Sequence, residues 1–174
     1  MRTIDWNNES NSIIMIDQTL LPMEYRVIEC KTLGSLCEAI KTLRVRGAPA
    51  LGAAGAFGVA LAATLSSTDN MDGLTKDLKI AAKTIKATRP TAVNLAWGVD
   101  RVIDAISDAY DLDSIKDIVL AEAKNIADED VATNKKLGKH GAKLLDDGDT
   151  VMTHCNAGKM ACVDWGTALG VIRS

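Results

Sequence analysis

Aromatic residues are scarce in this sequence. They make up 3% of its 174 residues, whereas alanine and glycine are plentiful. Because small side chains let helices approach one another closely, this composition favours closely packed helices over a β-sandwich. Hydrophobic residues make up 47% and charged residues 25% of the chain. These are ordinary values for a globular protein that buries a core without disulfides or a structural metal.

An excess of positive charge is also missing. The chain has 20 basic and 23 acidic residues, which gives a formal net charge of −3. No block of lysine and arginine is interleaved with aromatic residues, as a platform for single-stranded nucleic acid requires. The charge pattern therefore offers no basis for nucleic acid as a partner.

The cysteines lack the spacing of a zinc site. They are Cys30, Cys37, Cys155 and Cys162, and their gaps match no zinc pattern, so we expect neither a metal nor a cofactor. The first residues do not form a secretory signal, so we expect reduced thiols in a cytoplasmic protein. The apolar run Pro49–Leu65 contains three glycines and is shorter than a membrane span of roughly 20 residues. We expect it to be a buried helix in a protein without a membrane segment.

The spacing of apolar residues predicts a small antiparallel sheet followed by helices. Strands are expected within residues 1–31, including Ser12–Ile16 and Tyr25–Cys30. Helices are expected over Ser35–Arg44, Pro49–Leu65, Asp72–Thr88, Pro90–Ile106 and Ser114–Leu145, the last as one helix or two in line. Ser35 and Ser114 are the expected N-caps of their helices.

Arginine and glycine come directly before one expected helix, in Arg46-Gly47-Ala48-Pro49. Pro49 suits the first position of a helix, and Gly47 either takes a positive φ or lets another group approach the backbone. The Arg46 side chain, two backbone amides and a helix N-terminus then converge. This is the chemistry of an anion site, and phosphate is its usual occupant. The alternative is a plain turn between helices with a solvated arginine.

The same order of residues recurs at Arg89-Pro90, where Pro90 holds Arg89 extended at a second expected helix start. Two such starts in one small domain indicate a shared anion more strongly than either start alone. Other charged residues are interpreted as solvent-facing, namely Lys76, Lys79, Lys83, Lys86 and His140.

A strand, a tight loop and a helix are predicted near the end of the chain. Thr150–Thr153 has the β-branched composition of a short strand. Cys155 follows in a loop of small residues, and a helical pattern with Trp165, Leu169 and Ile172 comes next. A helix N-terminus beside the thiol favours the thiolate and would make Cys155 reactive. A buried, inert thiol at a strand end is the other interpretation.

Three motifs taken together resemble one known family. They are Val45-Arg46-Gly47-Ala48-Pro49-Ala50-Leu51-Gly52, Arg89-Pro90-Thr91-Ala92-Val93-Asn94-Leu95 and Thr153-His154-Cys155-Asn156-Ala157-Gly158. In this order they are similar to the motifs of the methylthioribose-1-phosphate isomerases. The wider family also holds the regulatory subunits of translation initiation factor 2B and archaeal ribose-1,5-bisphosphate isomerase. The resemblance covers essentially the whole chain.

The resemblance implies an α/β protein in which the substrate lies between two domains. Residues 1–147 would form a mainly helical N-terminal domain with a small antiparallel sheet. Residues 148–174 would be the strand, loop and helix that begin a truncated Rossmann-like domain. By the same resemblance, Arg46, Gly47, Ala48 and Arg89 bind a phosphorylated pentose, Cys155 is catalytic, and the protein is a homodimer.

The reaction implied is the aldose–ketose isomerisation of 5-methylthioribose 1-phosphate in methionine salvage. The family's partner aspartate lies in the second domain and Asp164 does not match its position, so we expect the 174-residue chain alone to be inactive. Two alternatives are a related substrate (5-deoxyribose 1-phosphate or ribose 1,5-bisphosphate) and a non-catalytic regulatory subunit. The presence of Cys155 with Arg46 and Arg89 argues against the regulatory subunit.

An exposed apolar face is also expected in the last residues of the chain. It would be formed by Val151, Val163, Leu169 and Ile172. Such a patch favours self-association.

Overall fold

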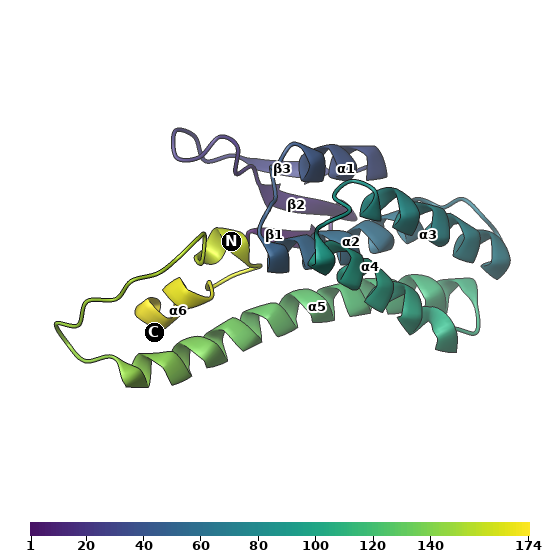
Figure 1. The fold of residues 1–174 in the computed structure, drawn as a ribbon. Helices are drawn as coiled ribbons and strands as arrows, with labels where there is room; N and C mark the ends of the chain where they lie inside the picture. The colour runs from purple at the N-terminus through teal and green to yellow at the C-terminus, as the bar shows by residue number, and fades with distance from the viewer.

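The computed structural model describes residues 1–174, apart from the side chain of Asp108. Strands β1 (Ile4–Asn7), β2 (Ser12–Ile16) and β3 (Val27–Cys30) form one antiparallel sheet in that order. The helices are α1 (Leu33–Lys41), α2 (Ala48–Leu65), α3 (Met71–Lys86), α4 (Val93–Ala105), α5 (Leu112–Gly141) and α6 (Ala168–Arg173), with short 3-10 turns η1 (Ile106–Asp108), η2 (Ala142–Leu144) and η3 (Lys159–Ala161). The predicted combination of a small antiparallel sheet with helices is confirmed (Figure 1).

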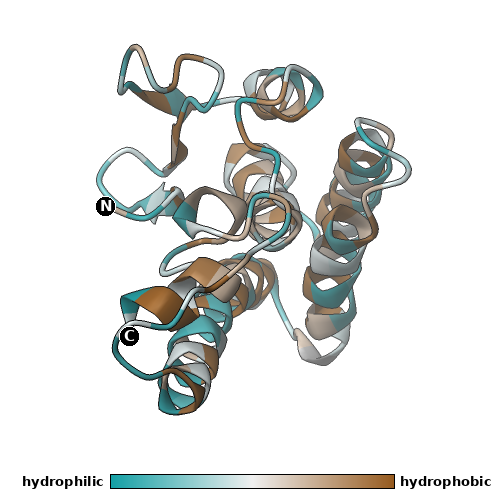
Figure 2. Ribbon diagram, turned by 60° about the vertical axis from the view of Figure 1, so that its left-hand side comes forward, coloured by the Kyte–Doolittle hydropathy of each residue, from teal (hydrophilic) through white to brown (hydrophobic). Residues whose placement is uncertain are grey.

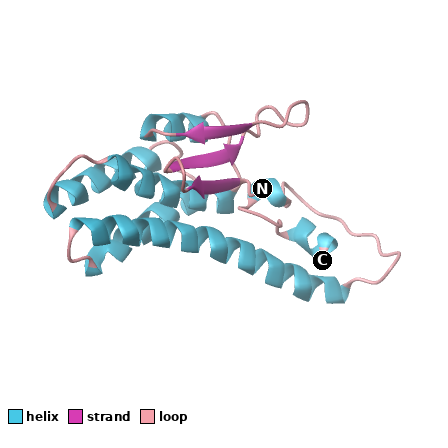
Figure 3. Cartoon of the chain, turned by 180° about the vertical axis from the view of Figure 1, so that it is seen from behind, coloured by secondary structure: helices cyan, strands magenta, loops and turns pink.

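The sheet covers one side of the helices, as Figure 3 shows from behind. Ile4 pairs with Met15 across β1 and β2, and Ile13 pairs with Cys30 across β2 and β3. All four of these side chains are buried. In β1 the buried residues alternate, because successive side chains in a strand face opposite sides, whereas β2 is buried at four of its five residues.

Helix α2 is the centre of the core and packs against α3, α4, α5 and the sheet. It is long and apolar enough to cross a membrane, yet 72% of it is buried inside the fold. Its glycines allow close helix contacts, as predicted from the sequence. A Cβ atom on Gly55 would lie 2.7 Å from the carbonyl oxygen of Leu95 in α4, too close for any side chain. Figure 2 shows the hydrophobic and hydrophilic residues along the helices.

The long helix α5 extends beyond the body formed by the sheet and the other helices, and α6 packs against its distal part (Figure 1). Between the two, residues 145–167 return toward the sheet. The strand predicted at Thr150–Thr153 is wrong, since these residues have no regular secondary structure. A strand requires a neighbour for its backbone N–H and C=O groups, and no described residue pairs with this segment.

The N-caps of α1 and α5 each lie three residues before the predicted N-cap. Thr32 is the N-cap of α1 and Asp111 is the N-cap of α5. Ser35 and Ser114, predicted as N-caps, are the third residues of these helices and bond back to the N-cap backbone. Both starts are capping boxes, in which the N-cap and the third residue satisfy each other's backbone. Of the two possibilities predicted for Ser114–Leu145, one helix or two in line, the structure has the single long helix α5.

The predicted exposed apolar face is correct in three of its four residues. Val151, Leu169 and Ile172 are exposed, but Val163 is fully buried. The carbonyl oxygen of Val163 accepts a hydrogen bond of 2.8 Å from the Thr3 amide. Val163 therefore belongs to the core beside the sheet rather than to the exposed face.

Glu29 in β3 is expected to make the stability of the fold fall in acid. Hydrogen bonds from Ser10 and Ser12 and the nearby Lys31 lower the pKa of its carboxyl group to about 2. The pKa of glutamate in an unfolded chain is about 4.3. A lowered pKa stabilises the fold above pH ~4.3, and this contribution disappears as the pH falls toward 2.

Urea midpoints of wild type and Glu29→Gln measure this effect. The variant should be the less stable of the two at pH 6, and the gap should shrink as the pH falls below about 4. Glu9→Gln, a change at an exposed residue in the turn between β1 and β2, is the control and should show little gap at any pH. A gap for Glu29→Gln that stays constant from pH 6 to pH 2.5 would contradict the assignment.

Candidate functional site

One cavity brings together all five residues predicted to form the site. It has a volume of about 660 Å³ and is lined by Leu43, Arg46, Gly47, Ala48, Pro49, Arg89, Cys155, Asn156, Ala161 and Thr167. These residues come from the loop between α1 and α2, the first turn of α2, the loop before α4, and the segment between α5 and α6. The lining carries two guanidinium groups and no carboxylate, so the cavity favours an anionic occupant.

The N-terminus of α2 forms one wall of this cavity. Gly47 is the N-cap, and none of the described side chains caps the first turn. Pro49 stands at the second helical position rather than the first, because α2 already begins at Ala48. The first amides of a helix have no partner within the helix, and they carry its positive dipole end. Free N–H groups and a nearby Arg46 are therefore available to an anion.

Gly47 is required here for a close approach and not for its backbone conformation. Its φ is −65°, which any residue can adopt. A Cβ atom at this position would lie 2.1 Å from the Cα atom of Ala161 and 2.2 Å from its carbonyl oxygen. The start of α2 is thus in direct backbone contact with η3, and Gly47 and Ala161 both line the cavity.

Arg89 reaches the same place from the loop before α4. Its Nη1 atom lies 3.5 Å from the carbonyl oxygen of Arg46, and its side chain is partly buried. The prediction that Pro90 opens this helix is wrong, since α4 begins at Val93 with Ala92 as its N-cap. The turn from Arg89 to Ala92 is closed by a backbone hydrogen bond of 3.0 Å instead. Both arginines nevertheless line one cavity, as the two-arginine pattern predicted.

Cys155 lines the same cavity from the segment that precedes η3. It is exposed and has a φ of 64°, a left-handed conformation that is uncommon for residues other than glycine. Strained backbone of this kind is concentrated at functional sites. The interpretation of Cys155 as a buried thiol at a strand end is therefore wrong. The helix after it, α6, begins only at Ala168.

Two groups near the cavity, the half-buried Asp130 and the fully buried Cys162, had no signal in the sequence. Burial raises the pKa of the Asp130 carboxyl group, and hydrogen bonds from Val163, Asn134 and Asp164 offset this only in part. Burial and the neighbouring Asp130 raise the pKa of the Cys162 thiol to about 11. Cys162 is consequently a protonated, inert thiol, whereas Cys155 is accessible.

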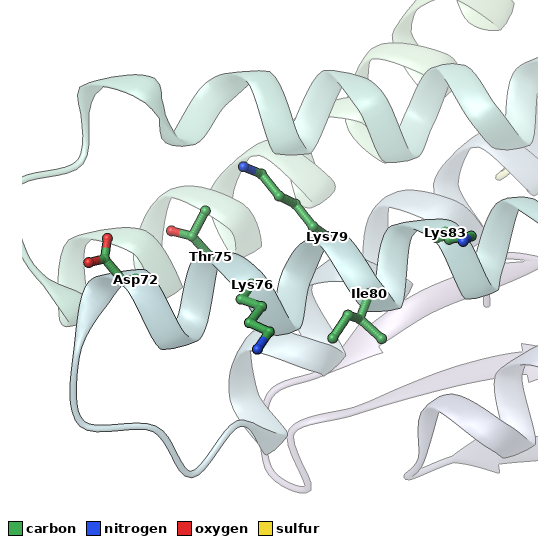
Figure 4. A pocket seen from close by; sticks show the side chains of 6 residues that line it. All are labelled: Asp72, Thr75, Lys76, Lys79, Ile80 and Lys83. Atoms are coloured by element: carbon green, nitrogen blue, oxygen red, sulfur yellow. The ribbon is translucent and has the colours of Figure 1, made fainter.

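Another cavity, of about 500 Å³, runs along α3 and is lined by Asp72, Thr75, Lys76, Lys79, Ile80 and Lys83. Figure 4 shows Lys76 and Lys79 pointing in different directions, so their ammonium groups do not converge on one point. This agrees with the predicted solvated lysine face. His140 is exposed on α5, as predicted. Among the described residues, no group of three or more His, Cys, Asp or Glu side chains is placed to hold a metal ion.

Comparison with known proteins identifies the relatives of the chain. Residues 44–174 match the initiation factor 2 subunit family. A Methanosarcina acetivorans protein, provisionally named a methylthioribose-1-phosphate isomerase, is 70% identical over 174 residues, which are 100% of this chain and 50% of that protein. The methylthioribose-1-phosphate isomerase of Thermosipho africanus is 43% identical over 172 residues, 99% of this chain and 49% of that protein.

Solved structures show the same relationship. The 5-methylthioribose 1-phosphate isomerase of Pyrococcus horikoshii superimposes with a TM-score of 0.93 at 42% identity, covering 99% of this chain and 48% of that one. The translation initiation factor eIF-2B subunit delta of A. fulgidus superimposes with a TM-score of 0.92 at 50% identity, covering 100% of this chain and 50% of that one. The chain therefore spans about half the length of the relatives that it matches.

Proposed function

The chain belongs to the initiation factor 2 subunit family, and from this premise we propose that it supplies the phosphate-binding half of an aldose–ketose isomerase. The substrate is a pentose 1-phosphate, and 5-methylthioribose 1-phosphate fits the names of several relatives. The observation that supports this most is the single cavity lined by Arg46, Gly47, Ala48, Arg89 and Cys155.

The phosphate is placed between the two arginines and the first amides of α2. Arg46 and Arg89 supply charge-assisted hydrogen bonds, which are about twice as strong as neutral ones. The helix N-terminus adds roughly 0.3–1 kcal/mol for an anion at its first turn. The sugar then extends toward Cys155 on the opposite wall of the cavity.

The chemistry is an internal oxidation and reduction that needs no redox partner. The bond between C1 and the ring oxygen breaks, and the ring oxygen takes a proton. A hydrogen moves from C2 to C1, as a proton through an enediol-like species or as a hydride. C2 becomes a ketone when its hydroxyl loses a proton, and the phosphate stays on C1. In this scheme Cys155 stabilises developing charge or carries a proton at the reacting carbons.

A carboxyl acid/base would complete such a site, and the ten lining residues include none. We place this group in the half of the relatives' length that the chain does not span, within a Rossmann-like domain that residues 148–174 begin. The 174-residue chain on its own is then expected to bind the sugar phosphate without turning it over. We also propose that the protein is cytoplasmic and forms a homodimer. The exposed apolar residues Leu144 and Met152 support self-association.

A second candidate function is regulatory, because subunit delta of eIF-2B matches this chain at 50% identity. A regulatory subunit has no need of an accessible cysteine facing two arginines. Related substrates, 5-deoxyribose 1-phosphate and ribose 1,5-bisphosphate, are alternatives within the enzymatic function. The first differs only by a small apolar group, against which pockets discriminate weakly.

Protection of Cys155 from alkylation tests the proposal. Iodoacetamide modification of each cysteine is followed by mass spectrometry with and without 5-methylthioribose 1-phosphate. At about ten times the Kd, the rate at Cys155 should fall to about a tenth, since only free protein reacts. Unphosphorylated 5-methylthioribose is the control and should protect little. If no phosphorylated pentose protects Cys155 in the folded chain, the regulatory function is favoured.

A further inference from the structure

We propose that Asp130, together with Thr3 and Gln18, positions Cys155 by anchoring residues 159–163 against the start of α2. The inference rests on the proposed function, in which Cys155 faces the sugar phosphate. None of these three residues lines the cavity. They act through the backbone of the segment that carries Cys155.

Asp130 anchors this segment from α5. Its Oδ2 atom accepts a hydrogen bond of 2.7 Å from the backbone N–H of Val163. Its Oδ1 atom accepts a hydrogen bond of 3.1 Å from the Asn134 side chain one turn along the helix. The second contact fixes the direction of the carboxylate, so that the first contact holds the Val163 amide at a set position.

Thr3, directly before β1, and Gln18, shortly after β2, hold the same segment from one end of the sheet. The Thr3 N–H donates to the carbonyl oxygen of Val163 at 2.8 Å, and the Thr3 hydroxyl donates to that of Lys159 at 3.0 Å. The Gln18 amide donates to the carbonyl oxygen of Met160 at 2.9 Å. Thr3 is fully buried and Gln18 is 9% exposed. Hydrogen bonds from the end of the sheet and from α5 therefore meet on five consecutive residues.

The anchored residues 159–163 contribute to the cavity wall through Ala161. Ala161, in the middle of the anchored segment, touches the backbone of Gly47 at the N-terminus of α2. Toward Cys155, the carbonyl oxygen of Ala157 accepts hydrogen bonds of 3.2 Å from both the Leu169 amide and the Thr167 hydroxyl. The chain on both sides of Gly158 is thus held, and Cys155 is set opposite Arg46 and Arg89.

A carboxylate at position 130 lowers the stability of the fold unless specific contacts compensate for its partial burial. Burial raises its pKa in spite of its hydrogen bonds, so its charged form is less favourable in the fold than in the unfolded chain. An apolar side chain would pack there without this penalty but would leave the Val163 amide unpaired. The retained charge fits the task of holding a backbone amide.

Cys162 offers a direct test, because it lies within the anchored segment and is fully buried. Iodoacetamide can reach Cys162 only when residues 159–163 move away from the core. Cys30 in the sheet and Cys37 in α1 are also buried, but they become accessible only through a different local opening or through global unfolding. In Asp130→Ala, iodoacetamide should modify Cys162 at least about ten times faster than in wild type, since a hydrogen bond to a charged group is lost. Cys30 and Cys37 should keep their wild-type rates.

Two further variants sharpen this experiment. Asp130→Asn keeps one acceptor oxygen and should give an intermediate rate at Cys162. Asp117→Ala removes an exposed carboxylate from the same helix and should leave all rates unchanged. An unchanged Cys162 rate in Asp130→Ala, or an equal rise at Cys30, Cys37 and Cys162, would overturn the proposal, because it would show no local anchoring.

The link to Cys155 is measured in the same samples. In Asp130→Ala, 5-methylthioribose 1-phosphate should still bind but should protect Cys155 several-fold less than in wild type. Full protection in a variant whose Cys162 has become reactive would also overturn the positioning role. If the wild type itself shows no protection, the proposed function fails instead, and the Cys162 rates still decide whether Asp130 anchors the segment.

Discussion

Replacing Gly47 by alanine is expected to lower the free energy of unfolding by about 3 kcal/mol, the upper part of the range for overpacked sites. The new Cβ atom would lie 2.1 Å from the Cα atom of Ala161. The atoms it meets are backbone, and the hydrogen bonds from Thr3 and Gln18 restrain their movement. The start of α2 and η3 would have to separate, and the cavity would lose its inner wall.

Gly34→Ala is the matched control for this change. Gly34 lies in α1, and the nearest atom to an added Cβ is the Thr32 hydroxyl oxygen at 3.8 Å, an ordinary contact. Alanine should stabilise this helix by roughly 0.5–1 kcal/mol. Urea unfolding of the two variants gives both values. A Gly47→Ala variant as stable as wild type would show that the close contact between α2 and η3 does not exist in solution.

The role of Gly47 illustrates what a sequence leaves open. The motif indicated either a positive φ or a close approach, and the observed φ of −65° selects the close approach. No local pattern identifies Ala161 as the partner, because this contact depends on how the end of the chain folds back. By contrast, the helix from Pro49 to Leu65 was predictable, since its apolar composition and its flanking residues are local features.

The wrong predictions concern one strand and two helix N-caps, and each has a physical cause. The β-branched residues at Thr150–Thr153 favour a strand, but strand propensity is expressed only beside a pairing partner. At Ser35 and Ser114 the capping-box pattern was recognised three residues late, because serine serves equally as the N-cap or as the third residue. The strand thus depended on a partner in space, whereas the two N-caps were decided by Thr32 and Asp111, three positions earlier in the sequence.

The candidate site was predictable to a similar extent. Two arginines before expected helix starts indicated an anion site, and the structure places both beside Cys155 in one cavity. Thr3, Gln18 and Asp130 could not be found in this way. Their partners are backbone atoms of residues 159–163, and a contact with backbone has no signature in the sequence of either partner.

The central claim is that Arg46 and Arg89 bind the phosphate of a pentose 1-phosphate beside Cys155. The most direct measurement is calorimetric titration of the 174-residue chain with 5-methylthioribose 1-phosphate. The double variant Arg46→Ala/Arg89→Ala should bind at least about 100-fold more weakly, since two hydrogen bonds between charged groups are lost at about 1.5–3 kcal/mol each.

Arg26→Ala/Lys83→Ala is the charge-matched control, because both of its residues are exposed and lie outside this cavity. The structure predicts one site per chain in wild type and in this control, with affinities that agree within about twofold, which is less than 1 kcal/mol. Absence of binding by the wild type, or equal affinity in the Arg46→Ala/Arg89→Ala variant, would contradict the assignment of this cavity to a phosphorylated pentose.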